Sequence, residues 1–301
     1  MCLLKIHSSK FFSVTAIALL TVMSLQLRAD EGDRRPLMDD EGNLVPDRRD
    51  GRADFALSAP PSALVEAWGG WSYPFRWLSK DALDFIDPKA DKYGYAYVRP
   101  NVRLLSSLKV NQAELRMDLY PLSFVGGTFG TVITQTDLAE VQKFEQWSGY
   151  DCSKISCHAS NIIHFAEFKF KWALPSKFFG VFFYRRDWGS SSGHDFNLTF
   201  DPSSALPFKS DGDYTTHLWV LVGRKVSQRA SLAVRYRDID WKISGARRRD
   251  LSGVYTFKLG GPWALGFEGR QIFRNLQGDF LSASLRLSYV WRNTPEPENL
   301  F

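Results

Sequence analysis

The chain has 301 residues, of which 44% are apolar and 15% are aromatic. This composition excludes a wholly disordered chain, because disordered chains lack the apolar surface that folding needs. The formal net charge is +5, and removing the three charges of Lys5, Lys10 and Arg28, which lie in a predicted signal peptide, leaves +2. So small a charge gives no reason to expect a nucleic-acid-binding protein.

Residues 1–29 are predicted to be a secretory signal peptide. Basic residues precede an apolar run from Phe11 to about Leu25, and Ala29 offers a small residue for cleavage. An uncleaved membrane anchor is the alternative. No later segment has the roughly 18 continuous apolar residues of a transmembrane helix.

Two segments with different patterns follow the signal peptide. Residues 30–60 are rich in Asp, Arg, Gly and Pro and are predicted to be a flexible periplasmic arm. Residues 61–92 are predicted to be an amphipathic aromatic helical segment, with a helix that begins at Pro74. Four apolar residues would share one face of that helix: Phe75, Leu78, Ala82 and Phe85. We expect an N-terminal packing element; a helix on the membrane surface or inside a barrel is the alternative.

From about Tyr95 to Trp291, apolar and polar residues alternate with a period of two, which is typical of strands with one apolar face. The stretch SASLRLSYVW at Ser282–Trp291 puts large apolar groups on one face and Arg286 with three serines on the other. Ten segments show the pattern, two within Tyr95–Tyr120 and then Phe124–Gln135, Ile162–Ala173, Phe178–Trp188, Tyr214–Arg224, Arg229–Trp241, Leu251–Leu259, Trp263–Arg274 and Phe280–Trp291. Nearly all could cross a bilayer as tilted strands of about 9–11 residues.

The connections between these segments alternate in length. Turn formers such as Pro121 and Pro175 make short connections, whereas Thr136–Asn161 and the stretch after Trp188 are long. Because lipid cannot hydrogen-bond the backbone, strands cross a membrane only as a closed barrel. Residues 93–291 are therefore predicted to form an all-β, antiparallel transmembrane barrel of about ten strands, within a range of eight to twelve, with a polar tail at 292–301. In an eight-stranded barrel, Tyr95–Tyr120 would be a hairpin outside it.

Over about Tyr95–Trp291 the chain resembles the bacterial outer-membrane β-barrel class, without matching a single family. The resemblance implies the outer membrane of a Gram-negative bacterium, its lipid as a partner, and insertion by the barrel-assembly machinery. Such barrels carry an assembly signal in the last strand that ends in an aromatic residue, and Tyr289 and Trp291 fit it. The glycine usual in that signal is replaced, with Arg286 nearby. Residues 30–92 could contact a periplasmic partner.

The period of two also sorts side chains into a lumen face. Eleven basic residues fall on it: Arg99, Arg103, Arg116, Lys169, Lys171, Arg186, Arg235, Arg237, Lys258, Arg270 and Arg286. Four acidic residues fall on it: Glu114, Asp118, Glu167 and Glu268. A slip of one residue in any strand would change this assignment.

Three functions are compatible with such a lumen. Buried charges must pair or stay wet, so a narrow barrel predicts an ion-paired, plugged interior and a scaffold or surface-interaction protein. A small pore is the alternative, and its positive excess would favour anions. A lipid-acting hydrolase is a third possibility, but no catalytic motif surrounds His158, His164, His194 or His217. We therefore expect no enzyme activity, no cofactor and no catalytic residue.

Two cysteines remain after the signal peptide, Cys152 and Cys157. In an exported protein, a close pair of this kind predicts a disulfide in an exposed loop. Metal binding with His158 is the alternative, but it supplies only three neighbouring ligands, and we expect no metal site.

Overall fold

The computed structural model describes residues 49–59, 62–71, 73–75, 96–107, 110–122, 124–137, 156, 158–174, 177–192, 197–201, 204, 206–260, 262–275 and 279–292. Several predictions lie outside these ranges. They are the signal peptide, the disulfide between Cys152 and Cys157, the polar tail 293–301, and the part of the predicted helical segment that follows Phe75.

The described residues form fifteen β-strands. They are β1 (Arg49–Ala59), β2 (Ser62–Trp71), β3 (Tyr73–Phe75), β4 (Ala96–Ser107), β5 (Val110–Leu122), β6 (Val125–Asp137), β7 (His158–Leu174), β8 (Phe178–Ser192), β9 (Leu198–Asp201), β10 (Leu206–Lys209), β11 (Asp213–Lys225), β12 (Ala230–Trp241), β13 (Arg247–Gly260), β14 (Trp263–Arg274) and β15 (Phe280–Arg292). None of the described residues forms a helix long and apolar enough to span a bilayer.

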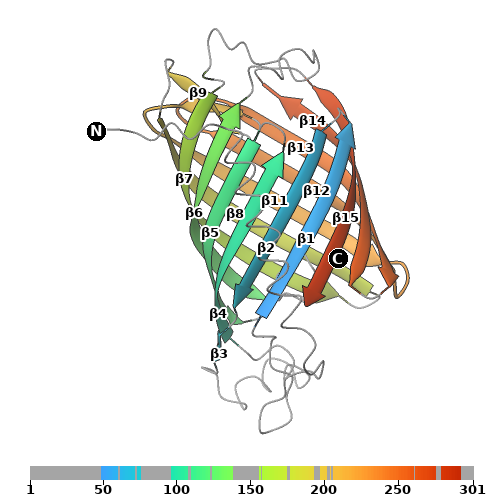
Figure 1. Cartoon of the computed structure of the whole chain (residues 1–301). Coiled ribbons are helices and arrows are strands. Elements are labelled where there is room, and N and C mark those ends of the chain that lie inside the picture. Colours follow the sequence, from blue (N-terminus) through green and yellow to red (C-terminus); the bar gives the residue numbers. More distant parts are fainter. Residues whose placement is uncertain are drawn as a thin grey trace.

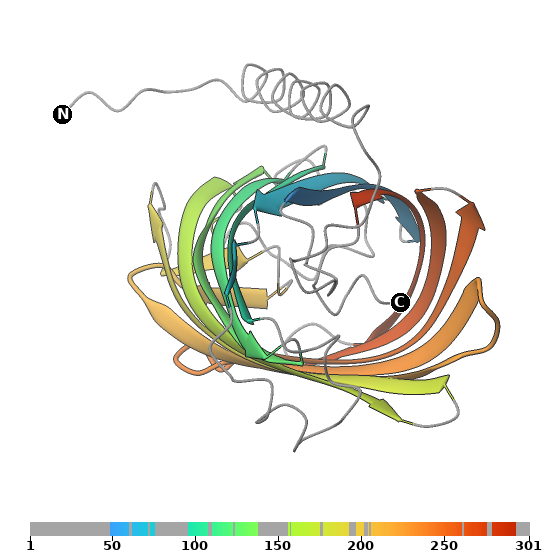
Figure 2. The same cartoon turned by 90° about the horizontal axis from the view of Figure 1, so that it is seen from below.

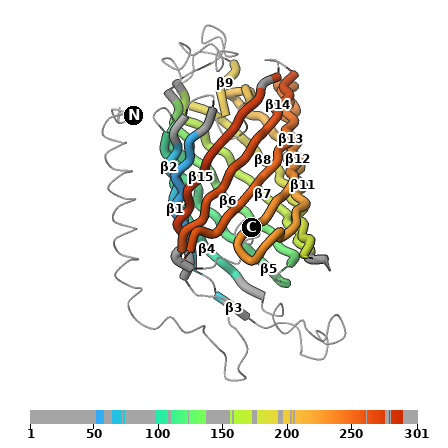
Figure 3. Tube along the Cα trace, turned by 90° about the vertical axis from the view of Figure 1, so that its right-hand side faces the viewer, coloured from blue at the N-terminus to red at the C-terminus, as the bar shows by residue number. Residues whose placement is uncertain are grey.

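Twelve of these strands close into an antiparallel barrel (Figures 1 and 2). Each pairs with its neighbours in the order β1, β2, β4, β5, β6, β7, β8, β11, β12, β13, β14, β15, and β15 pairs back onto β1. Figure 3 shows β15 between β14 and β1, where the first and last strands meet. The short strand β3 extends the edge of β4, and β9 pairs with β10 as a separate hairpin.

The prediction of an all-β barrel is confirmed, but the strand number is twelve and not ten. The two additional strands are β1, within the predicted arm, and β2, within the predicted helical segment. The predicted helical segment 61–92 is therefore wrong over 62–71 and 73–75, which are strands, and Pro74 does not begin a helix. In addition, Tyr95–Tyr120 is not a hairpin outside the barrel, because β4 and β5 both belong to its wall.

A close backbone approach explains why Gly70 lies in a strand. Gly69 and Gly70 lie inside β2, opposite Val102 and Asn101 of β4. A Cβ atom at Gly70 would come within 2.8 Å of Arg99 Nε and of Asn101 Cβ. Glycine at this position therefore lets the β2 backbone pass beside buried polar side chains of β4.

The outer face of the barrel is apolar. In β1, Phe55 and Leu57 are about half exposed, whereas Asp54 and Ala56 between and beside them are buried. The same alternation continues around the barrel, with exposed residues that include Leu115, Phe129, Phe168, Leu232, Phe267 and Leu285. This is the arrangement that a lipid-facing surface requires.

The two ends of the barrel differ in their connections. Residues 138–157 and 193–212 link strands at one end, whereas 175–177 and 226–229 are short turns at the other end, which also carries the long connection 76–95 between β3 and β4. Outer-membrane barrels have long outer loops and short periplasmic turns. The end that carries β9 and β10 is therefore the extracellular end (Figure 1).

Candidate functional site

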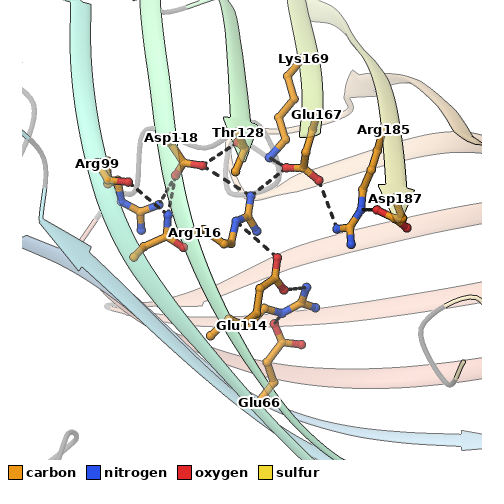
Figure 4. Close-up of polar contacts among 12 residues, drawn as sticks. Glu66, Arg99, Glu114, Arg116, Asp118, Thr128, Glu167, Lys169, Arg185 and Asp187 are labelled. Atoms are coloured by element: carbon orange, nitrogen blue, oxygen red, sulfur yellow. Dashed lines mark hydrogen bonds and ion pairs between the residues drawn. The ribbon is translucent and has the colours of Figure 1, made fainter. Parts of the chain in front are cut away.

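The inner wall carries a continuous chain of charged side chains, here called the ion-pair network, and Figure 4 shows most of its members. It runs across neighbouring strands from β2 to β11. Its members are Glu66, Arg99, Arg103, Glu114, Arg116, Asp118, Glu167, Lys169, Arg185, Asp187 and His217.

Glu167 is the centre of the ion-pair network. Its Oε1 lies 3.1 Å from Arg116 Nη2 and 3.2 Å from Lys169 Nζ, and its Oε2 lies 3.4 Å from Arg185 Nη1. The Glu167 side chain is 2% exposed. One buried carboxylate therefore joins cations from β5, β7 and β8.

Asp118 is the second buried carboxylate, on β5. Its Oδ2 accepts hydrogen bonds from Arg99 Nη1 at 3.0 Å and from Asn101 Nδ2 at 2.7 Å. Its Oδ1 accepts one from Thr128 Oγ1 at 2.6 Å. Both Arg99 and Asp118 are fully buried. A buried ion pair is stable only when neighbouring groups form hydrogen bonds with its remaining donors and acceptors, as Asn101 and Thr128 do for Asp118.

The two ends of the ion-pair network reach β2 and β11. At one end Arg103 Nε lies 2.7 Å from Glu66 Oε1. At the other end Asp187 lies 2.5 Å from Arg185 Nε and 2.8 Å from His217 Nε2. Apart from His217, the network contains five basic and five acidic residues, so its formal charges cancel.

The inner faces of β12–β15, here called the cationic wall, are built differently. Arg235 and Arg270 both bind Glu268, with 2.9 Å from Arg270 Nη2 to Glu268 Oε2. Arg237 and Arg248 both bind Asp250, with 2.7 Å from Arg248 Nε to Asp250 Oδ1. Four guanidinium groups thus share two carboxylates.

Arg286 on β15 adds a further positive charge to the cationic wall. Its side chain is exposed, and no carboxylate lies within ion-pair distance among the described residues. Its direct partners across the sheet are Ala56 and Gly266, which are small. The Arg286 side chain is therefore exposed on the inner wall, and it interacts electrostatically with Glu66.

The two parts of the inner wall also differ in side-chain volume. Large groups such as Phe165, Phe179 and Lys169 are buried on β7 and β8. On β14 and β15 the inward residues include Ala264, Gly266, Ser282, Ser284 and Ser288. A water-filled path through the barrel would therefore have most room beside β14 and β15.

The β9–β10 hairpin packs into the extracellular mouth. Leu206 and Phe208 are fully buried against Ile239, Trp241 and Ala246. The Phe208 and Trp241 rings stack with centroids 4.8 Å apart. Because these partners lie on the inner face of β12 and the turn after it, the hairpin narrows the mouth from the side of β11 and β12.

Most residues predicted for the lumen lie on the inner wall. Those in the ion-pair network are Arg99, Arg103, Glu114, Arg116, Asp118, Glu167 and Lys169, and those on the cationic wall are Arg235, Arg237, Lys258, Glu268, Arg270 and Arg286. Lys171 lies against the ring of Tyr120, 5.0 Å from its centroid.

Arg186 does not lie on the inner wall. It is exposed on the outer face, opposite Thr216 and Ala166, while its chain neighbours Arg185 and Asp187 point inward. Three consecutive charged residues give no alternation, so the pattern allowed either phase. Because of the same error, Arg185 and Asp187 were not assigned to the inner wall. Tyr184 lies on the same face of β8 as Arg186 and is 41% exposed.

The remaining site predictions concern aromatics and histidines. Tyr289 lies at the periplasmic end of β15, edge-on to Trp263 with ring centroids 4.9 Å apart, and Trp291 is the second-last residue of that strand. His164 lies on the outer face, with its Nδ1 2.9 Å from Thr131 Oγ1. Among the described residues, no group of three His, Cys, Asp or Glu side chains could hold a metal ion.

No protein-family model and no curated protein sequence matches the chain. Among solved structures the chain is similar to the NanC porin, with 9% identity and a TM-score of 0.42 over 81% of this chain and 100% of that one. It is also similar to the KdgM porin, with 8% identity and a TM-score of 0.41 over 79% and 98%. An outer-membrane channel from Pseudomonas putida F1 has 12% identity and a TM-score of 0.43 over 85% and 100%. None of these likenesses assigns a solute to this chain.

The chain's own strand pairing decides its class. Twelve antiparallel strands close on themselves, the outside is apolar, and the inside is charged. A surface of this kind is stable only in a bilayer, where a closed barrel satisfies every backbone group. The fold is therefore that of a closed, twelve-stranded transmembrane β-barrel, the architecture of Gram-negative outer-membrane proteins.

Proposed function

We propose that this barrel is an outer-membrane channel whose water-filled path runs along the cationic wall and favours anions. The observation that carries the proposal is Arg286, an exposed inner-wall guanidinium without an ion-pair partner among the described residues. Arg286 interacts electrostatically with Glu66 but forms no ion pair with it, and a charge without a direct partner is very costly away from water, so Arg286 needs a hydrated surrounding. Hydration at this height of the barrel supports a channel over a plugged scaffold.

The charge distribution supports the preference for anions. The ion-pair network contributes no net formal charge, whereas the cationic wall has four guanidinium groups on two carboxylates, with Arg286 in addition. Fixed positive charge along a narrow aqueous path raises the local concentration of anions. The fixed charge of this wall therefore favours anionic solutes.

The test is the reversal potential of the refolded protein in a planar bilayer under a KCl gradient, after heat-dependent gel mobility has confirmed folding. We expect stable unitary conductance steps and a reversal potential with the sign of a channel that is more permeable to chloride than to potassium. Arg286→Gln should lower the chloride-to-potassium permeability ratio about twofold to fivefold, the effect of one charge near a hydrated path.

Arg186→Gln is the matched control, because it removes an exposed arginine from the outer face of the same barrel. It should leave the permeability ratio unchanged. Absence of conductance from correctly folded protein would overturn the channel and favour the scaffold. A cation preference, or equal effects of the two variants, would overturn the role of Arg286.

A further inference from the structure

A row of polar side chains crosses the outer face of the barrel toward its extracellular end. Arg186 on β8, Thr216 on β11, Asp240 on β12 and Arg247 on β13 are direct partners across successive strands. Their chain neighbours, such as Arg185 and Arg248, form ion pairs on the inner wall. The row therefore lies on the surface that faces lipid.

Arg186 lacks an acidic partner in this row. Its side chain is exposed, and among the described residues no carboxylate lies within ion-pair distance of it. Its guanidinium carbon lies 5.8 Å from the centroid of the Trp188 ring and 5.3 Å from that of the Tyr214 ring. These rings hold the group in place by cation–π interactions, but they do not neutralise its charge.

The other end of the row is also positive. Arg247 and Arg249 share Asp238, at 3.0 Å from Arg247 Nε and 3.5 Å from Arg249 Nε. The Arg247 and Arg249 side chains are 42% and 50% exposed, whereas that of Asp238 is 16% exposed. Lys242 pairs with Asp240, which lies opposite Arg247, so three cations meet two carboxylates at this end of the row.

We propose that this row binds the phosphate groups of a phosphorylated lipid in the outer leaflet. An arginine on the lipid-facing surface is unfavourable unless it reaches the headgroup region or an anion. The exposed rings of Trp188 and Tyr184 lie beside Arg186 on the outer face, as in an aromatic belt at the interface. A phosphate accepts paired hydrogen bonds from a guanidinium group, so a headgroup phosphate supplies the anion that Arg186 lacks.

The position of the row identifies the source of the phosphate. Arg247 is the first residue of β13, and Asp240 is the last but one of β12, so this end of the row reaches the extracellular rim. Apolar side chains such as Leu218 and Val220 lie further along β11 on the same outer face as Thr216. They would contact the acyl chains of a lipid whose headgroup contacts the arginines. A free phosphate has no acyl chains and would leave these apolar side chains without a contact. The proposal does not depend on the barrel's being a channel.

The test uses the full refolded protein in zwitterionic detergent micelles. The probe is a bis-phosphorylated glycolipid, and the readout is the urea midpoint of unfolding as a function of probe concentration. We expect the probe to raise the midpoint of the unmodified protein. The Arg186→Gln/Arg247→Gln variant should bind it at least about tenfold more weakly, since each charged hydrogen bond that is lost is worth about 1.5–3 kcal/mol.

Arg224→Gln is the matched control. Arg224 also lies on the outer face against an aromatic ring, with its guanidinium carbon 5.3 Å from the centroid of Phe178, but at the periplasmic end. This variant should keep the affinity of the unmodified protein. The single variant Arg186→Gln gives a second reading if the double variant does not fold.

Three results would overturn the proposal. The first is an equal shift with the dephosphorylated glycolipid, because it would show that acyl chains alone are bound. The second is the same shift with inorganic phosphate alone, because it would identify a free-anion site. The third is full affinity in both Arg186 variants.

Discussion

The two halves of the inner wall carry similar residues but use them differently. In the ion-pair network, Arg99, Asp118 and Glu167 are at most 2% exposed, and each carboxylate contacts several cations and polar groups. On the cationic wall, the side chains of Arg235, Arg270 and Glu268 are 18%, 22% and 14% exposed. The centre of the first half is closed and neutral, although Arg103 at its end is 36% exposed. The Arg235–Glu268–Arg270 cluster of the second half keeps contact with water, whereas its Arg248–Asp250 pair is buried.

Under the proposed channel function, this difference lets one barrel be both rigid and conductive. A buried ion pair is maintained only when each charge finds its partner, and removal of one partner is strongly destabilising. A partly hydrated arginine tolerates the loss of a partner, and its charge remains available to a solute. We therefore assign stability to the ion-pair network and selectivity to the cationic wall.

The largest expected effect comes from loss of the central carboxylate of the network. Glu167→Gln leaves Arg116, Lys169 and Arg185 buried around a neutral amide, which should cost about 3–5 kcal/mol of unfolding free energy. The measurement is the urea midpoint of the refolded protein in detergent, followed by gel mobility. Glu268→Gln on the cationic wall is the matched change. It should cost clearly less, and equal losses would contradict the assignment of stability to one half.

A smaller effect is expected from filling the space beside Arg286. A Cβ atom at Gly266 would meet only Arg286, at 3.7 Å from its Cβ, so a side chain there can extend into the barrel. Gly266→Trp should lower the unitary conductance by roughly half, because conduction follows the open cross-section of the path. Gly253→Trp points to the lipid side, where nothing lies within 4 Å of the added Cβ. Its conductance should equal that of the unmodified protein, and a similar decrease in both variants would argue against a path at β14 and β15.

The barrel could be predicted from the sequence over the region where apolar and charged residues alternate. For example, the alternation of Leu115, Arg116 and Met117 predicts which face of β5 contacts lipid. The strand β2 could not be recognised, because Ala67, Gly69 and Gly70 provide little contrast between its two faces. The phase of β8 was ambiguous because Arg185, Arg186 and Asp187 are all charged.

The site could be predicted only as a set of residues. The lumen assignment contained Arg116 and Glu167, but not their contact, because these residues are 51 positions apart in the chain. That contact depends on the register of three strands, which local patterns do not fix. The charge balance of one half and the excess of the other follow from such contacts, so they appear only in the closed barrel.

The most direct test of the division into two halves is the reactivity of single cysteines toward a water-soluble, charged thiol reagent during current recording. Ser284→Cys places a thiol on β15 beside the cationic wall, and Thr134→Cys places one at a fully buried inner position of β6. Both would be made in a background in which Cys152 and Cys157 are replaced by serine. We predict rapid modification and a stepwise fall in current for Ser284→Cys, and neither for Thr134→Cys. Equal reactivity at the two positions, or reactivity at residue 134 alone, would contradict a water-filled path along the cationic wall.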